Sequence, residues 1–404
     1  MTAPRNPRFP LFDSLRAIAA LSVLLFHIAF VLEGFTDPNW GRYATQLNIG
    51  VPIFFLISGF LLYRPFAQAR YDGRALPSIR GYATRRLFRI VPAYWVAITV
   101  IALPAGLLWF PFGLIGSDLP VVFDHPYFHY TFTHVFNRQD LLTGVGHTWT
   151  LAVEMQFYVF LPVWAFLLRQ LPRGSDRQFV LTEALPLVAI FAIGLLWNLT
   201  MIERTAGNLV LFSPEVAVIP RFLDHFALGM GLAVASVVLA GRERRPSAVR
   251  LVEDRPWVPW LLAGLGFVVL ANLGANYISA DVEPVRHELR GLIALGLLAP
   301  AVFGETRGGT VRRVLAWPPL VWVGLVSYSL YLWHPAIAQK IVYTQLDENI
   351  GWVVPAMLAV VASIAVAAVS FYAIERPALR AGRTLARRHE RRPEDDVTAR
   401  AGAP

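Results

Sequence analysis

The sequence predicts an all-α fold, a polytopic membrane helix bundle of about ten transmembrane helices. Of the 404 residues, 56% are hydrophobic and 16% are charged, and the mean hydropathy is +0.50. Apolar runs of about twenty residues, the length that crosses a bilayer as a helix, recur from one end of the chain to the other. Short basic segments separate many of these runs, as is typical of loops between membrane helices.

Ten apolar windows mark the expected helices, in chain order residues 12–34, 46–66, 90–112, 148–170, 180–200, 220–240, 256–275, 289–305, 319–342 and 351–374. They lie within one membrane domain over residues 1–380. The remaining residues, 381–404, are polar and rich in arginine, and we expect a short, disordered cytoplasmic tail there.

The distribution of charge predicts the orientation. If the N-terminus lies inside the cell, most of the 36 lysines and arginines fall on the inner side, which places both termini in the cytoplasm of a multi-pass protein of the inner (plasma) membrane. The net charge of +9 does not indicate nucleic-acid binding, because the arginines form clusters between apolar windows rather than one basic stripe. The chain has no cysteine, which excludes a disulfide and a thiolate nucleophile.

The first window contains two residues that are costly in a membrane, in the stretch SLRAIAALSVLLFH. Arg16 and His27 are eleven residues apart, so on a helix they differ by about 20° in direction and about 16 Å in height. They share a face on which Ala20, Val23 and Leu24 leave room for a slender ligand. The alternatives are that Arg16 extends to the headgroups or pairs with Asp13, and that His27 only hydrogen-bonds a neighbouring helix.

A second group of residues is expected at the same depth in the membrane as His27. The fourth window places Glu154, and the ninth places His334, about as far below the outer surface as His27. Ionisable groups at this depth usually face a cavity, so they predict a site, although three unrelated interhelical contacts remain the alternative. The neighbours expected to bind an acceptor or support the site are Tyr328, Tyr331, Trp149 and Asp224.

Arginines at the inner boundary form a third group. Arg86 and Arg89 are three residues apart and share a helix face, close to the expected level of Arg16. Two guanidinium groups there can hold phosphate oxygens, although the positive-inside rule alone also accounts for arginines at this boundary.

The longest outer segment, at about residues 113–147, is rich in aromatic residues. We expect it to lie against the membrane surface or to cover a cavity.

These segments resemble the acyltransferase family 3 membrane proteins over about residues 11–380. The resemblance depends on the spacing of Arg16 and His27 and on five further segments in the family's order: GVPIFFLISGFLLYRP at 50–65, RRLFRIVPAYW at 85–95, HTWTLAVEMQFYVFLP at 147–162, SYSLYLWHPAI at 327–337 and FYAIERPAL at 371–379. Thr150 and Met155 depart from the residues common at those positions of the family.

The resemblance implies transfer of an acyl group, often acetyl, from cytoplasmic acyl-CoA to a hydroxyl of a carbohydrate or glycoside. It implies that His27 is the catalytic histidine and Arg16 the first-helix arginine. It also implies that Arg86 and Arg89 are the arginine pair that binds acyl-CoA, and that Glu154 is the acidic residue of the TWTLAVE segment. Many relatives carry an extracytoplasmic hydrolase-like domain at the C-terminus, which we do not expect in this chain.

The chemistry of these residue types agrees with that implication. Acyl transfer to an alcohol needs a base for the hydroxyl proton, which His27 can supply directly or after forming an acyl-imidazole. Glu154 could orient the imidazole, and His334 or Tyr331 could bond the acceptor or the oxyanion. We expect acetyl-CoA as the donor, a lipid bilayer as the surroundings and no metal. A proton-coupled transporter of a sugar-like or anionic solute remains the alternative function.

Overall fold

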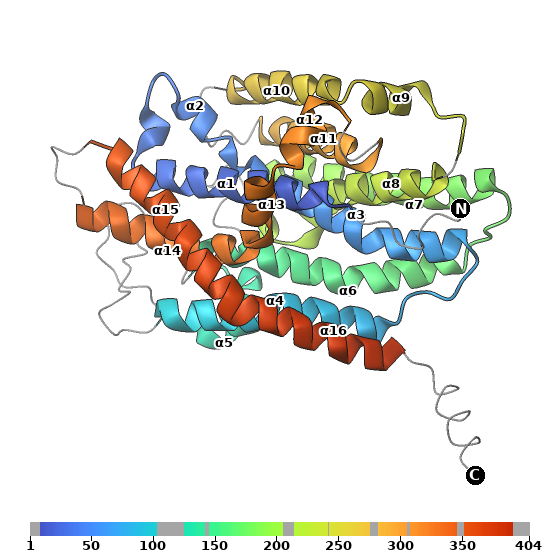
Figure 1. Cartoon of the computed structure of the whole chain (residues 1–404), viewed down its shortest axis with the longest axis horizontal. Helices are drawn as coiled ribbons and strands as arrows, with labels where there is room; N and C mark the ends of the chain where they lie inside the picture. The colour runs from blue at the N-terminus through green and yellow to red at the C-terminus, as the bar shows by residue number, and fades with distance from the viewer. Residues whose placement is uncertain are drawn as a thin grey trace, which may run out of the picture.

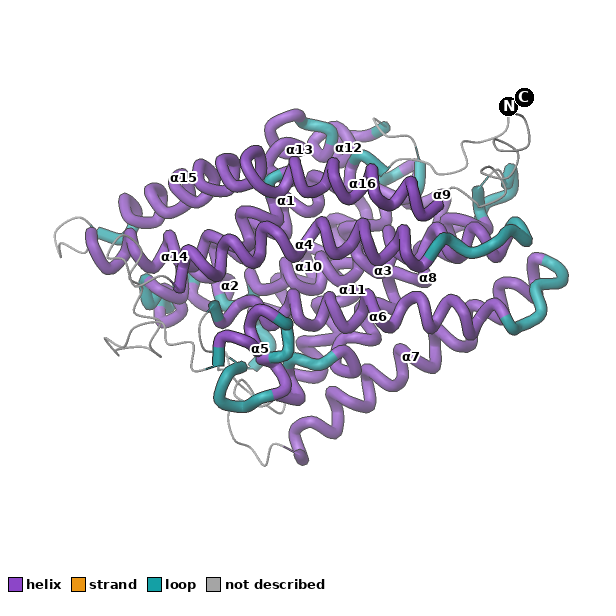
Figure 2. The backbone as a smooth tube through the Cα atoms, turned by 90° about the horizontal axis from the view of Figure 1, so that it is seen from below, coloured by secondary structure: helices purple, strands orange, loops and turns teal. Residues whose placement is uncertain are grey.

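The computed structural model describes residues 9–102, 125–141, 145–204, 214–240, 242–274, 282–304, 308–345 and 351–390. Within these ranges the chain forms helices and no strand, which confirms the predicted all-α class. The long helices run side by side along one axis, with α2 and α5 near one end of the bundle and α9 and the last turns of α16 near the other (Figure 1, Figure 2).

The α-helices are α1 (Leu11–Val31), α2 (Gly41–Ala44), α3 (Gly50–Tyr71), α4 (Ile79–Ala102), α5 (Pro126–Tyr130), α6 (Trp149–Arg169), α7 (Asp176–Arg204), α8 (Leu223–Val238), α9 (Ser247–Asp254), α10 (Trp257–Ala271), α11 (Glu283–Val302), α12 (Gly309–Leu315), α13 (Pro318–Leu325), α14 (Ser327–Gln345), α15 (Val353–Ser370) and α16 (Arg376–Glu390). One π-helical turn, Phe371–Glu375, joins α15 to α16.

Six of the described helical segments are long and apolar enough to cross a membrane, and a seventh is the pair α13 and α14, bent by 74°. The predicted number of ten is not confirmed. The helix α10 is short, at 15 residues, and two other helices carry charges that lower their hydropathy. These charges are Arg80, Arg85, Arg86 and Arg89 on α4, and Glu283, Arg286, Glu288 and Arg290 on α11.

The helices α3 and α8 are in close contact, and two glycines let their backbones meet. A Cβ atom on Gly59 would lie 2.5 Å from the Phe226 carbonyl oxygen, and one on Gly229 would lie 2.2 Å from the Leu56 carbonyl oxygen. No side chain larger than hydrogen fits at either position. Small residues at such crossings are typical of membrane helices, because van der Waals packing drives helix association in lipid.

The helix α1 is held by contacts with α12 and α13. The Ser14 hydroxyl donates a hydrogen bond of 2.5 Å to the Leu315 carbonyl. Gly324 lies so close to α1 that its Cβ would meet the Asp13 carbonyl oxygen at 1.7 Å. These contacts fix the rotation of α1, and therefore the direction in which Arg16 and His27 point.

The tail prediction is wrong for residues 381–390, which continue the α16 helix. Polar composition suggested disorder, but α16 lies along α4, where Gly382 packs on Phe88 and Arg85 forms an ion pair with Glu390 (Figure 1). Residues 391–404 lie outside the described ranges. The helix α4 begins at Ile79, eleven residues before the apolar window at 90–112, so its first half carries the boundary arginines, and the Ser78 hydroxyl accepts from the Gly81 N–H there.

The aromatic outer segment is described from residue 125 to 141, so its parts at 113–124 and 142–144 lie outside the described ranges. The described part packs on the second half of α4. The Tyr94 hydroxyl donates to the His129 carbonyl (3.0 Å), and the Trp95 indole N–H donates to the Tyr130 carbonyl (3.0 Å).

Candidate active site

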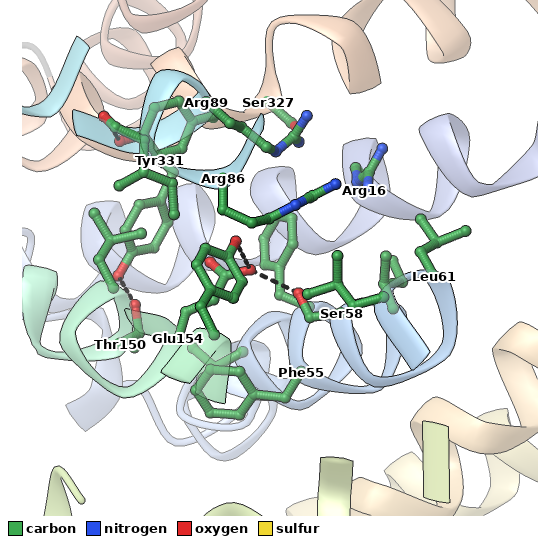
Figure 3. A pocket seen from close by; sticks show the side chains of 18 residues that line it. Arg16, Phe55, Ser58, Leu61, Arg86, Arg89, Thr150, Glu154, Ser327 and Tyr331 are labelled. Atoms are coloured by element: carbon green, nitrogen blue, oxygen red, sulfur yellow. Dashed lines mark hydrogen bonds between the residues drawn. The ribbon is translucent and has the colours of Figure 1, made fainter. Parts of the chain in front are cut away.

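A cavity of about 180 Å³ lies among five of the helices. It is lined by residues of α1, α3, α4, α6 and α14, among them Arg16, Arg86, Arg89, Glu154 and Tyr331. The three guanidinium groups gather on one side of it, and Glu154 and Thr150 lie on another side (Figure 3). The structure therefore brings together the predicted inner arginines and the predicted acidic residue in one cavity.

Two of the arginines lack a fixed acidic partner. Arg16 pairs with Asp13 at 3.1 Å, as one alternative predicted. Within the described residues, neither Arg86 nor Arg89 forms an ion pair or a side-chain hydrogen bond, and Arg86 Nε is buried with no partner. Glu375, the buried acid whose charge attracts Arg89, instead accepts a hydrogen bond from Ser329 (2.9 Å). Positive charge without a fixed partner makes this side of the cavity suited to an anion.

Glu154 is held inside the cavity by neighbouring hydroxyl groups. The Ser58 hydroxyl donates to Glu154 Oε1 at 2.6 Å, and the Tyr158 hydroxyl donates to the same oxygen at 2.8 Å (Figure 3). Its hydrogen bonds therefore link α3 to α6 and do not involve His27, which separates Glu154 from the expected role of orienting the imidazole. Arg86 lies over the Tyr158 ring at 6.0 Å, so the acid and the unpaired arginine share this tyrosine as a neighbour.

His27 and His334 meet directly, as their common depth predicted. His334 Nε2 lies 3.0 Å from His27 Nδ1, and their ring centroids are 4.9 Å apart. His147, which the sequence interpretation did not single out, completes a group of three imidazoles, 5.9 Å from the His27 ring and 5.4 Å from the His334 ring. Its position two residues before Trp149, in the same GHTWT segment, was the available signal.

Tyr331 separates this histidine group from the cavity. Its hydroxyl donates to the His147 carbonyl at 2.5 Å and contacts the Thr150 hydroxyl at 2.5 Å. Its ring lies 4.9 Å from His147 and 5.8 Å from His334, while its other side lines the cavity. The described cavity lining does not include His27, so the two parts of the site are adjacent but are not one open space.

The route expected along α1 is filled. Ala20, Val23 and Leu24 are 0–2% exposed and belong to the packed core. None of the three lines the cavity, which instead follows α3, α4 and α6. The prediction that these side chains leave room for a slender ligand is therefore wrong, because neighbouring helices occupy that face.

Other predicted site residues lie near these groups with structural contacts of their own. The Tyr328 hydroxyl donates to the Ile90 carbonyl at 2.7 Å, and its side chain lines the cavity. Trp149 stacks on Phe222 with ring centroids 5.6 Å apart.

Asp224 belongs to a separate buried cluster with His225 and His287, whose donor atoms lie within 4.8 Å of one another. His287 Nε2 is 3.0 Å from Asp224 Oδ2, and the spacing alone could suit a metal ion. However, the two imidazoles are stacked, 4.1 Å apart and within 9° of parallel. Two parallel planes cannot both contain one ion, so a shared ion requires one ring to turn.

The fold and site together define a class: a membrane helix bundle with a cationic cavity beside a group of three histidines. The sequence model of the acyltransferase domain, family 3, matches residues 10–374, and the chain belongs to this family. The resemblance stated from the sequence is thereby confirmed.

Curated relatives carry acetyltransferase names. The chain is 27% identical over 350 residues to a Staphylococcus aureus (strain COL) protein named "Putative O-acetyltransferase", covering 84% of this chain and 52% of that protein. It is 26% identical over 381 residues to the peptidoglycan O-acetyltransferase OatA of Listeria monocytogenes, covering 91% of this chain and 55% of that one. The chain thus spans about half the length of these relatives. No solved structure matches it.

Proposed function

We propose that the protein is a membrane O-acyltransferase that moves an acyl group, acetyl or another short chain, from cytoplasmic acyl-CoA to a hydroxyl group. The acceptor is a glycan or glycolipid of the envelope, or a glycosylated small molecule. The observation that carries this proposal is the cavity in which Arg86 and Arg89 form no ion pair among the described residues. Tyr331 lines this cavity and contacts the ring of His334, which in turn lies 3.0 Å from His27 Nδ1.

In this proposal, electrostatic attraction to arginines holds the acyl-CoA donor. Arg86 and Arg89 form no ion pair among the described residues, so their guanidinium groups can donate to the phosphates of CoA, and guanidinium–phosphate hydrogen bonds are among the strong ones. Arg16, which is paired with Asp13, adds positive charge to the same cavity. The cavity volume of about 180 Å³ suits the slender pantetheine arm rather than a bulky ligand. Tyr331 must turn for the thioester to reach His27, and the proposal requires that movement.

In this proposal His27 accepts the hydroxyl proton. Its Nδ1 lies 2.9 Å from the Val23 carbonyl, which can only accept, so Nδ1 carries the hydrogen and Nε2 carries the lone pair. Nε2 takes the acceptor hydroxyl proton while the alcohol oxygen bonds to the thioester carbonyl carbon. The carbon–sulfur bond then breaks, the proton passes to the departing thiolate, and the products are the ester and CoA.

The test is acyl-CoA consumption by the full chain in lipid nanodiscs. With radiolabelled acetyl-CoA and an envelope glycan fraction, the wild type releases CoA and labels the glycan. We expect His27→Ala to lose the labelling by a factor of about 100 or more, the size of a general-base contribution. The matched control is His389→Ala, which removes an exposed histidine of α16 and leaves the rate unchanged.

Two results would overturn the proposal. One is His27→Ala that retains the wild-type rate. The other is movement of a sugar-like or anionic solute across the membrane without acyl-CoA, which would establish the transporter alternative.

A further inference from the structure

The hydrogen bond between His27 and His334 joins the first helix to α14 at the centre of the histidine group. His334 is fully buried, with 0% exposure, and its Nε2 lies 3.0 Å from His27 Nδ1. A contact between two basic groups is stable only if one nitrogen carries a hydrogen and the other carries a lone pair, so the tautomers decide what this contact does.

The helices themselves fix both tautomers. His27 Nδ1 faces the Val23 carbonyl at 2.9 Å, and His334 Nδ1 faces the Leu330 carbonyl at 3.0 Å. Each carbonyl is an acceptor, so each Nδ1 carries a hydrogen in the neutral ring, and each Nε2 carries a lone pair. The His27 Nδ1–H is therefore shared between the Val23 carbonyl and His334 Nε2.

We propose that His334 is a positioning residue for His27, and that it does not bind the acceptor. Its Nε2 accepts the His27 Nδ1–H, holds the ring with Nε2 free, and stabilises the imidazolium that forms when His27 takes the hydroxyl proton. The inference rests on the proposed function, since it assigns a role in the same proton transfer.

A neutral imidazole suits this buried position better than a carboxylate does. A carboxylate in a site with 0% exposure would cost several kcal/mol in every step during which His27 is neutral. The lone pair of His334 carries no net charge, yet its hydrogen bond strengthens as soon as His27 becomes positive. The proton remains on His27 and goes to the departing thiolate, so His334 gains none.

His147 does not compete for this role. Its Nε2 lies 2.8 Å from the Tyr331 carbonyl and therefore carries the hydrogen. Its Nδ1 is buried with no partner, and no hydrogen bond joins it to His27 within the described residues. Of the two neighbouring imidazoles, only His334 accepts from His27.

The experiment compares two amides of different length at position 334. In His334→Gln the terminal amide oxygen occupies nearly the place of Nε2 and can still accept from His27. In His334→Asn the amide reaches only the place of Nδ1, so it can bond the Leu330 carbonyl but not His27. The control is Ser363→Ala, which removes a buried hydroxyl without a partner from α15, the helix that packs on α14.

We expect His334→Asn to lower kcat by about 10–100-fold with the KM for acetyl-CoA changed by less than about 2-fold, since the lost interaction exists mainly in the transition state. His334→Gln restores kcat to within about 5-fold of the wild type, and Ser363→Ala matches it. Thermal unfolding of each variant identifies loss of fold, and rates are compared per folded protein.

Equal kcat values for the Gln and Asn variants, whether both high or both low, would contradict the positioning role of His334. That result leaves the proposed function intact if the wild type consumes acyl-CoA and His27→Ala does not. Absence of acyl-CoA consumption by the wild type would instead contradict the proposed function itself.

Discussion

Two sets of arginines in this bundle differ in how their charge is neutralised. Arg70 on α3 is 7% exposed and bonds the Glu183 carboxylate at 2.6 Å and the Thr182 hydroxyl at 2.8 Å. Arg312, 2% exposed, donates to five backbone carbonyl oxygens. Arg86 and Arg89 have no such partners among the described residues and line the cavity.

This difference distinguishes arginines whose charge stabilises the fold from arginines whose charge can attract a ligand. A buried ion that is paired and hydrogen-bonded costs little to keep but much to break. A charge left without a partner beside a cavity costs stability in the free protein, and that cost is recovered when an anion binds. Arg70 and Arg312 therefore stabilise the fold, whereas Arg86 and Arg89 are available for a ligand.

The largest expected effect is on stability, at the paired arginine. Arg70→Ala leaves the Glu183 carboxylate, which is 0% exposed, without its cation. We expect the free energy of unfolding to fall by about 3–5 kcal/mol, as for other broken buried ion pairs. Thermal and denaturant unfolding of the protein in detergent micelles measures this loss.

The double variant Arg70→Met with Glu183→Leu is the control for that change. It removes both charges and fills the space, so it should recover most of the lost stability. Equal destabilisation of the single and double variants would show that Arg70 acts through packing on Phe179, 5.2 Å away, rather than through charge.

The second effect concerns binding, at the unpaired arginines. Arg86→Gln and Arg89→Gln should each weaken CoA binding by about 10–100-fold, because each removes a charge-assisted contact worth about 1.5–3 kcal/mol. Each should lower the melting temperature much less than Arg70→Ala does, since neither side chain forms a hydrogen-bonded ion pair among the described residues. Titration calorimetry with CoA, at two salt concentrations, measures the affinity together with its electrostatic share.

If these variants lower the melting temperature as much as Arg70→Ala does and leave the CoA affinity unchanged, the distinction between Arg70 and these two arginines would be wrong. That result would place them with Arg70 as structural arginines at the membrane boundary, which is the positive-inside explanation that the sequence left open.

Periodicity and depth predicted part of this site because they depend on a single helix. The shared face of Arg86 and Arg89 and the common level of His27 and His334 follow from helical rise and rotation alone. The hydrogen-bond partners of the site residues cannot be predicted from helical rise and rotation. Glu154 lines the cavity with the inner arginines rather than contacting His27, and its hydrogen bonds with Ser58 and Tyr158 depend on how α3 and α6 are rotated against each other.

The fold shows the same division between local and long-range information. Hydropathy located the apolar cores of α1, α6, α7 and α8 to within a few residues. It misplaced the start of α4 and the nature of α16, because these two charged helices gain stability by packing on each other. The hydropathy of a single sequence reflects local composition but not packing against a helix that is distant in the chain. Polar helices that depend on such packing are therefore the elements that it fails to predict.

The smallest expected effect is at Arg85, and it sharpens the comparison because Arg85 lies on the same helix as Arg86 and Arg89. Arg85 immediately precedes Arg86, but its charge is paired with Glu390 of α16, and both side chains are partly exposed. Arg85→Gln should therefore change the free energy of unfolding by at most about 1 kcal/mol, the size of a surface ion pair. It should change CoA affinity by less than about 3-fold, since solvent and salt screen the charge at this position. Calorimetry beside Arg86→Gln checks this, and a loss of affinity equal to that of Arg86→Gln would mean that CoA responds to the total charge of this helix rather than to the arginines without partners.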